Sequence, residues 1–517
     1  MKTWPRTVLS LIFLASAASS VVAQPALTLQ QQASHVLNRL GFGPRPGDLE
    51  RVLQMGVGRY IDAQLDPASV PLPETLTQQL GALELTGQGA GRTLSDFLAV
   101  RQMVKGEDDA ARQKRRDVVT RITVQTAQAR LLRAIGSPRQ LEEVMVDFWF
   151  NHFNVFSGKG LDRALVNSYE RDAIRPNAMG RFRDLLGATA KHPAMLFYLD
   201  NWTSIGADVV PGTRPGAGPK ARASGLNENY ARELMELHTI GVDGGYSQKD
   251  VTELARMLTG WSFEPRALVR EEQGFRFDAA RHDVGAKEWL GYHVDAAGQR
   301  EGEFALDILA AHPATAQRVS YQLAQYFVQD APPPALVARL AKRFVDSGGD
   351  IRAVLRTLFA SPEFMAPAAF GAKFKTPYQF VVSAVRVTGL PVGGVRSLMA
   401  TLNQLGMPLY GWPTPDGYKN TQAAWLNPDA ITRRIGFANT LASGRLALFD
   451  APGSGTSTGA PAAEAGETPA GAAPVDAALL LDSLGGAMSA QTVAIAARNP
   501  LPLRASMLLG SPDFMQR

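Results

Sequence analysis

The stretch Leu226-Asn-Glu-Asn-Tyr-Ala-Arg-Glu-Leu-Met-Glu-Leu-His-Thr-Ile-Gly241 decides the fold class of this chain, because it combines a helical pattern with several polar residues. It has no proline, and its only glycine is the last residue. Asn227 is a good N-cap, and Gly241 can adopt the left-handed conformation that commonly ends a helix. The stretch therefore predicts a helix of about four turns.

The faces of this helix separate its polar side chains into two groups. At about 100° per residue, one arc should be buried, and it consists of Leu226, Tyr230, Leu234 and Leu237. Glu233 points into this arc and His238 lies at its edge. Burial raises the pKa of a carboxyl group and lowers that of an imidazole, which brings both toward neutral pH. We predict Glu233 as a catalytic acid or base; the alternative is that both are buried polar groups satisfied by hydrogen bonds.

The opposite face carries Glu228, Arg232 and Glu236 at i, i+4 spacing. This spacing is typical of a solvated ladder of ion pairs. It is equally compatible with a substrate-binding face, on which Glu228, Arg232 and the neighbouring Asn229 would position a substrate.

A second unusual stretch is the apolar run at residues 144–155, in which Asp147 is the only charged residue, and Asn151 and His152 follow one turn later. An unpaired buried carboxylate costs several kcal/mol, so Asp147 needs a cation, a metal ion or several hydrogen-bond donors. A structural salt bridge would satisfy it. The functional alternative makes Asp147 the partner of Glu233 in an acid/base pair, with Asn151 binding substrate.

The sequence predicts a small β element on an otherwise helical body. Residues 274–278 and 289–294 alternate like short strands and predict one hairpin near residues 274–294. His282 and Asp283 would lie at its tip, as metal ligands or as a simple turn. The chain has no cysteine, so a divalent metal would need His, carboxylate or amide ligands, which favours zinc, manganese, calcium or magnesium. The candidate ligands are His152, His238, His282 and Asp283.

Residues 410–418, Tyr-Gly-Trp-Pro-Thr-Pro-Asp-Gly-Tyr, form an aromatic loop stiffened by proline. Trp412 and Tyr418 could stack on a sugar ring, or they could pack against the body of the protein.

The two ends of the chain differ from its middle. Residues 1–23 have the basic start, short apolar run and small-residue end of a signal peptide, so we expect export to the periplasm or beyond and no transmembrane segment afterwards. We expect a helical domain at 24–449, a low-complexity linker at 450–478, and a short helical segment at 479–517 that packs on the main domain. Residues 203–225 are rich in glycine, proline, alanine and serine and are predicted to cover the site.

The net charge of +5 is too small to indicate a nucleic-acid partner, since basic and acidic residues are interleaved. A polysaccharide or another cell-envelope polymer is compatible with it.

The chain resembles the bacterial family called domain of unknown function 1800. The most specific motif is Asn227-Glu-Asn-Tyr-Ala-Arg-Glu233, and the resemblance extends over residues 40–44, 148–155, 198–201, 227–245, 282–291, 361–364 and 411–418. It implies an exported, mostly helical bacterial protein and no particular activity. Asn177 stands where the family is expected to have His, which weakens any metal site that uses this position.

Two functions are compatible with these features. The first is an exported hydrolase of a glycan or another polymer, with Glu233 and Asp147 as the acid/base pair and a possible divalent metal. The second is an exported, non-catalytic binding or assembly protein in which the buried polar groups form a structural network. The predicted fold is all-α, a single large multi-helix domain with one small hairpin.

Overall fold

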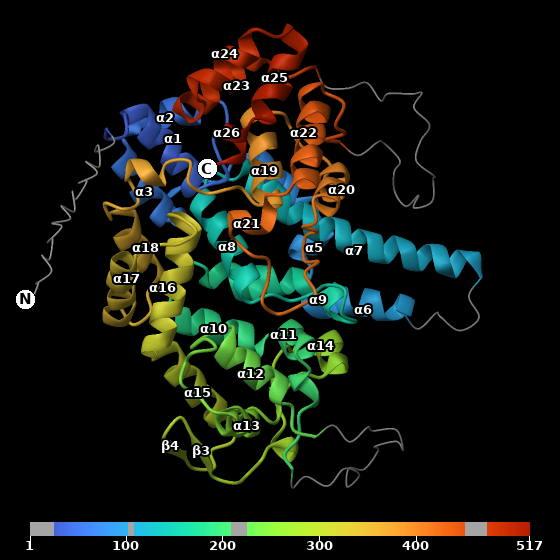
Figure 1. Ribbon diagram of the computed structural model, residues 1–517. Helices are drawn as coiled ribbons and strands as arrows, with labels where there is room; N and C mark the ends of the chain where they lie inside the picture. The colour runs from blue at the N-terminus through green and yellow to red at the C-terminus, as the bar shows by residue number, and fades with distance from the viewer. Residues whose placement is uncertain (1–24, 102–107, 208–224, 450–472) are drawn as a thin grey trace, which may run out of the picture.

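The computed structural model describes residues 25–101, 108–207, 225–449 and 473–517 (Figure 1). In these residues the protein is mainly helical and has two small two-stranded antiparallel sheets, which confirms the predicted fold class. The predicted signal peptide and most of the predicted cover and linker lie outside the described residues. None of the helices described is long and apolar enough to cross a membrane.

The N-terminal part begins with short amphipathic helices and ends in a long helical pair. The short helices are α1 (Leu29–Arg39), α2 (Asp48–Met55), α3 (Val57–Leu65), α4 (Glu74–Gly81) and α5 (Glu84–Gly87). They are followed by α6 (Ala90–Arg101) and the 28-residue α7 (Asp109–Gly136), which pack together and project from the body (Figure 1). Only the second half of α7 is largely buried, where its sequence changes from charged to apolar.

Helix α8 (Gln140–His152) is the central element of the core. Nearly every residue of α8 is buried, because its apolar side chains occur on all faces of the helix. It packs against α3, α7 and the π-helical turn at Tyr169–Ile174. The same part of the chain forms α9 (Asp162–Ser168), α10 (Phe182–Lys191) and α11 (Pro193–Tyr198). The indole N–H of Trp149 donates to the carbonyl of Ala178 at 3.0 Å, which satisfies its polar atom within the core.

The helix predicted at residues 226–241 is shorter than expected. Helix α12 comprises Glu228–Glu236, and Asn227 caps its start as predicted. The hydroxyl of Thr239 donates to the carbonyl of Leu234 at 2.6 Å and so competes with the backbone for the last turn. Gly241 adopts the expected left-handed conformation, φ 87°, but beyond the helix end.

The single hairpin predicted near residues 274–294 is wrong, because these residues belong to two separate sheets. Strand β2 (Arg276–Phe277) pairs with β1 (Trp261–Ser262), and β3 (Lys287–Trp289) pairs with β4 (Tyr292–Val294). Leu290 and Gly291 both have positive φ and make the two-residue turn between β3 and β4. His282 and Asp283 therefore lie between the sheets and not at a hairpin tip. Nearby are α13 (Gln248–Met257), α14 (Pro265–Glu271) and α15 (Gln299–Ala311).

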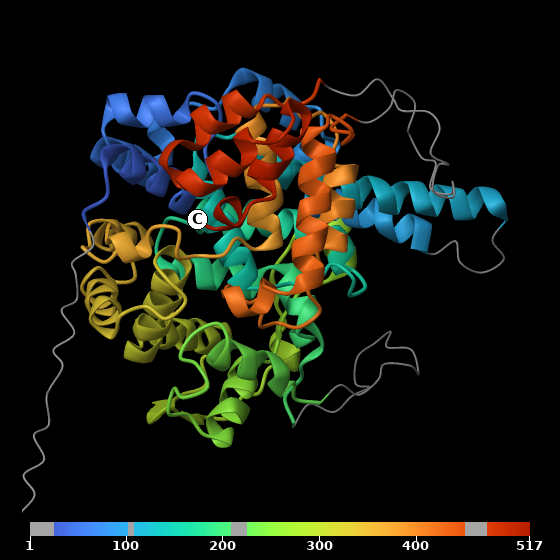
Figure 2. The same ribbon diagram turned by 45° about the horizontal axis from the view of Figure 1, so that its top comes forward.

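The C-terminal half consists of helices that pack back on the core. They are α16 (Pro313–Phe327), α17 (Pro334–Asp346), α18 (Ile351–Phe359), α19 (Pro377–Thr388), α20 (Arg396–Gln404), α21 (Gln422–Trp425) and α22 (Pro428–Ala442). The final segment contains α23 (Ala477–Leu484), α24 (Ala490–Ala497), α25 (Leu501–Leu509) and α26 (Pro512–Met515), so helix begins two residues before the predicted linker ends. Figure 2 shows these last helices against α22, and the backbone of Gln516 pairs with that of Phe374.

Candidate functional site

The candidate site is a cleft of about 310 Å³ in the middle of the molecule. Its walls come from α8, α16, the start of α19, and the chain between α20 and α21. The lining residues that bear hydrogen-bonding side chains are Asp147, Asn151, His152, Arg318, Tyr321, Gln322, Gln325, Tyr326, Thr376, Gln379, Asp416, Tyr418, Lys419 and Asn420. Three of the sequence-predicted residues of α8 and one of the aromatic loop are therefore brought together.

Asp147 lies at this cleft as one member of a buried ion-pair network. Its carboxylate accepts a hydrogen bond from Arg130, which also binds Glu170 at 2.9 Å. The hydroxyl of Tyr410 donates to Glu170 at 2.9 Å. Burial raises the pKa of Asp147, and the charge of Arg130 opposes the rise. Asp147 therefore forms the structural salt bridge that was one of its two alternatives, and Arg130 is the cation.

Asn151 fixes the aromatic loop (residues 410–418) to α8. Its side-chain amide donates to the carbonyl of Tyr418 at 2.9 Å and accepts from the backbone N–H of the same residue at 2.7 Å. Asn154 donates to the carbonyls of Trp412 and Thr414 at 3.0 and 2.8 Å. A Cβ atom on Gly417 would lie 2.2 Å from the carbonyl oxygen of Asn151, so this close approach requires glycine. The amides of Asn151, in α8, and Asn154, just after its end, thus hold the loop in position.

The aromatic rings of this region form a partly exposed group. The ring centroids of Trp412 and Tyr418 lie 4.8 Å apart, and those of Tyr418 and Trp425 lie 6.0 Å apart. Tyr418 itself lines the cleft. The rings pack on one another, as the packing alternative expects. They also keep partly exposed faces, as stacking on a sugar ring would require.

Helix α16 supplies the longest polar wall of the cleft, and the sequence reasoning missed it. Five of its residues line the cleft at spacings of three or four, which places them on one helical face, namely Arg318, Tyr321, Gln322, Gln325 and Tyr326. A run of polar and aromatic side chains at helical spacing is the signal that could have found this wall. Such a run usually faces solvent, and only the packing of α8 opposite shows that it faces a cleft.

His152 and His238 lie near each other, with ring centroids 6.3 Å apart. Nε2 of His152 donates to the backbone carbonyl of His238 at 3.0 Å. Burial, together with the charge of Arg318, lowers the pKa of His152 to about 4. Burial also lowers the pKa of His238 well below its usual value, and Nε2 of this ring has no hydrogen-bond partner. Both imidazoles are therefore neutral at pH 7.

Glu233 lies near the aromatic loop and outside the cleft wall. Its carboxyl is partly buried, and burial together with the charges of Glu236 and Asp416 raises its pKa. Asp416 shows the opposite shift. Burial raises its pKa, but hydrogen bonds from Lys419, Thr414 and Trp412 outweigh this effect and lower the pKa to about 2. The pKa values of these two carboxyl groups are therefore shifted in opposite directions.

The three other candidates on α12 lie away from the cleft. Glu228 accepts hydrogen bonds from Gln248 and Thr252 at the start of α13. Arg232 donates to Gln248 at 2.8 Å, and Asn229 is exposed. This face of α12 is bonded to α13, and it contributes no side chain to the cleft lining.

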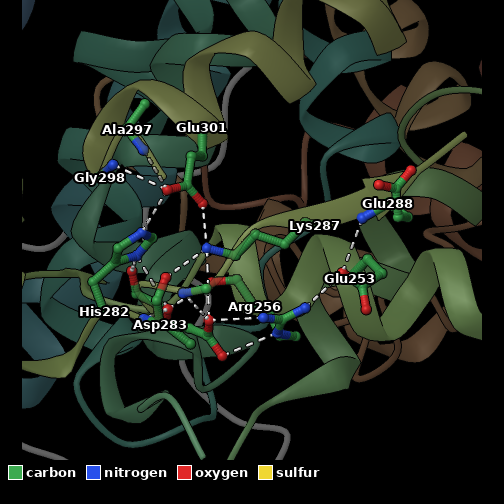
Figure 3. A network of polar contacts seen from close by, with 11 residues as sticks. Glu253, Arg256, His282, Asp283, Lys287, Glu288, Ala297, Gly298 and Glu301 are labelled. Carbon is green, nitrogen blue, oxygen red and sulfur yellow. Dashed lines mark hydrogen bonds and ion pairs between the residues drawn. The ribbon is translucent and has the colours of Figure 1, made fainter. Parts of the chain in front are cut away.

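His282 and Asp283 belong to a separate buried network (Figure 3). Nε2 of His282 lies 3.0 Å from Glu301, which also receives Nζ of Lys287 at 2.6 Å. Arg256 binds both carboxylate oxygens of Asp283, at 3.0 and 2.9 Å. The network ties the segment before β3 to α13 and α15.

The four predicted metal ligands thus form two groups with different partners. In the described part of the chain, no three His, Asp or Glu side chains are arranged to hold a metal ion. Nε2 of His152 is bonded to protein and Nε2 of His238 has no partner, while His282 and Asp283 are both bonded to protein.

The structure is that of a mainly helical protein whose candidate site is a cleft lined by polar and aromatic side chains. The chain belongs to the family described as a protein of unknown function (DUF1800), whose model matches residues 35–516. The match includes the C-terminal segment beyond the predicted linker. No curated protein and no solved structure matches the chain.

Proposed function

We propose that the protein binds a polyhydroxylated ligand, a segment of a glycan, in the cleft between α16 and the aromatic loop. The observation that carries this proposal is the wall of α16, which sets amide, phenol and guanidinium groups opposite Tyr418 and the carboxylates of Asp147 and Asp416. Sugar hydroxyls both donate and accept hydrogen bonds, and their ring faces pack on aromatic side chains. A cleft of about 310 Å³ lies within the usual range of small-ligand sites.

Unused hydrogen-bonding capacity in the cleft wall supports the same conclusion. The side-chain oxygens of Gln322 and Asn420 are buried and make no hydrogen bond of normal geometry, although Gln322 lies close enough to His152 to oppose the fall in its pKa. Buried polar atoms are normally paired, so each unpaired one requires a reason. A bound ligand would explain two such oxygens beside one cleft. A small shift of either side chain would let its oxygen accept a hydrogen bond from a ligand hydroxyl.

A titration of hexasaccharides of glucose, N-acetylglucosamine and galacturonate, followed by tryptophan fluorescence, tests the proposal, since Trp412 and Trp425 lie beside Tyr418. We expect saturable binding of at least one of them. Gln322→Ala should weaken it by about fivefold, because one net hydrogen bond contributes about 1 kcal/mol and tenfold in affinity is about 1.4 kcal/mol. Gln317→Ala is the matched control, since Gln317 is exposed on the same helix. Absence of saturable binding to all three sugars would contradict the proposal.

A second candidate function, hydrolysis of the bound glycan, is favoured by the opposite pKa shifts of Glu233 and Asp416. A raised and a lowered carboxyl pKa are what an acid and an ionised partner need in glycoside hydrolysis. Asp416 is the ionised partner of Glu233 in this proposal. Asp147 was first considered for that role, but Asp147 is paired with Arg130. In this proposal the glycan extends from the cleft past Asp416 to Glu233, which lies outside the cleft wall and donates the proton. Export would bring the enzyme to its polymer.

Glu233→Gln separates hydrolysis from binding alone. It should lower turnover by about 10²–10⁴-fold, the usual contribution of a general acid, while leaving affinity unchanged. Glu271→Gln is the control, because Glu271 is exposed on α14. If the wild-type protein binds a sugar and never cleaves it, the protein is a non-catalytic binding protein.

A further inference from the structure

We propose that the glycan bound in this cleft carries negatively charged groups, and that Arg318 binds one of them. The inference rests on the proposed binding function and names the class of ligand. Arg318 would act as the anchoring residue of the cleft, and uronic acid carboxylates or sulfate esters are the groups whose chemistry fits it.

The position of Arg318 leaves its positive charge without a carboxylate. The guanidinium lines the cleft and makes one long hydrogen bond, from Nη2 to the carbonyl of Leu237 at 3.3 Å. Its Nε is buried and has no partner. Among the described residues no carboxylate pairs with it, and Glu236 acts on it only through its more distant charge. A partly buried cation of this kind gains a partner when an anion enters.

The other charged groups of the cleft are already neutralised. Asp147 is paired with Arg130, and Asp416 is paired with Lys419 at 2.8 Å. His152 is neutral because its pKa is lowered to about 4. Among the described residues that line the cleft, Arg318 is therefore the charged group without an ion-pair partner, and complementarity favours a negative ligand.

The geometry around Arg318 leaves space for its planar group. A Cβ atom on Gly241 would lie 3.3 Å from Nη1 of Arg318, so the glycine that follows α12 gives the guanidinium room. Arg318 lies one turn from Gln322 on the same face of α16. A guanidinium can bind a carboxylate through two parallel hydrogen bonds, while the neighbouring amide binds an adjacent hydroxyl.

The test compares one oligosaccharide in charged and uncharged form. The probes are the galacturonate hexamer, its fully methyl-esterified form and a sulfated glucose hexamer, measured by calorimetry in low salt. We expect the charged galacturonate to bind at least about tenfold more tightly than its ester, because hydrogen bonds to charged groups contribute more than neutral ones. The sulfated probe shows whether sulfate replaces carboxylate.

Variants then assign the preference to Arg318. Arg318→Gln should bind the acid and the ester equally. Arg318→Lys should keep part of the preference for the acid, because lysine retains the positive charge but lacks the planar guanidinium that binds a carboxylate through two hydrogen bonds. Arg352→Gln, which removes an exposed arginine on α18, should retain the full preference.

Equal affinity of wild type for the acid, its ester and the sulfated probe would overturn the inference and leave the glycan cleft intact. If the charged probes are favoured and Arg318→Gln keeps that preference, Arg318 is not the anchor. If none of these probes binds while the glucose or N-acetylglucosamine hexamer does, the inference is overturned and the proposed function stands. If none of those neutral hexamers binds either, the proposed function itself fails.

Discussion

Replacing Arg130 should destabilise the protein far more than replacing Asp147. Buried or nearly buried charges meet between α7, α8 and the π-helical turn, where Asp147, Glu143 and Glu170 are paired with Arg130 and Arg175. Arg130→Met leaves Asp147 with no paired cation, and Glu170 keeps only Arg175 at 3.6 Å. Removing one partner of a buried pair costs about 3–5 kcal/mol.

Asp147→Asn should be milder, because Arg130 keeps Glu170 as a partner at 2.9 Å. The cost is then the weakening of one charged hydrogen bond, about 1.5–3 kcal/mol. Urea unfolding at pH 7, followed by far-ultraviolet circular dichroism, measures both values.

The cost of Arg130→Met should shrink in acid. Without Arg130, burial raises the folded-state pKa of Asp147 further above the unfolded value of about 3.9, so the folded variant binds more protons than the unfolded chain. Its stability therefore falls as pH rises above about 4 and recovers as pH falls toward that value. Equal costs for the two variants, or a cost of Arg130→Met that does not depend on pH, would refute the view that Asp147 is part of an ion-pair network.

Three further predictions concern the loop, the second network and a buried histidine. Gly417→Ala should displace the aromatic loop and abolish ligand binding, because the new Cβ would lie 2.2 Å from the carbonyl oxygen of Asn151; undisturbed tryptophan fluorescence and binding would contradict this. Lys287→Met should cost about 3–5 kcal/mol in urea unfolding at pH 7, since it removes the cation 2.6 Å from the buried carboxylate of Glu301; a loss below about 1 kcal/mol would show that the pair is dispensable. His152 has a pKa of about 4 in the folded protein and about 6.5 in the unfolded chain, so it should reduce stability by about 3 kcal/mol as pH falls from about 6.5 to 4. His152→Gln should flatten this part of the curve of stability against pH. An unchanged curve would contradict the prediction.

Local signals in the sequence predicted the helical fold well. The N-cap at Asn227 occurs where the pattern placed it, because such caps depend on neighbouring residues. Gly241 is left-handed as expected, but α12 ends at Glu236, so Gly241 does not end the helix. The β elements could not be predicted in the same way. Strand β2 pairs with residues that follow α13, and sequence alternation does not reveal the partner of a two-residue strand.

The candidate site was predicted only in part, for a similar reason. Asp147, Asn151 and His152 stood out because polar residues in an apolar run are rare, and they do reach the cleft. The wall of α16 did not stand out, since its polar face has the pattern of an ordinary surface helix. His282 lies in a different network from His152, where it is paired with Glu301. Long-range packing decides which network a residue joins, and residue spacing in the sequence does not indicate it.

The most direct test of the central claim is a crystal structure of the protein soaked with the galacturonate hexamer. We predict sugar density in the cleft between α16 and the aromatic loop, with a carboxylate on the guanidinium of Arg318 and a hydroxyl within hydrogen-bond distance of Gln322. Well-ordered sugar bound elsewhere on the molecule, with the cleft empty, would contradict the account.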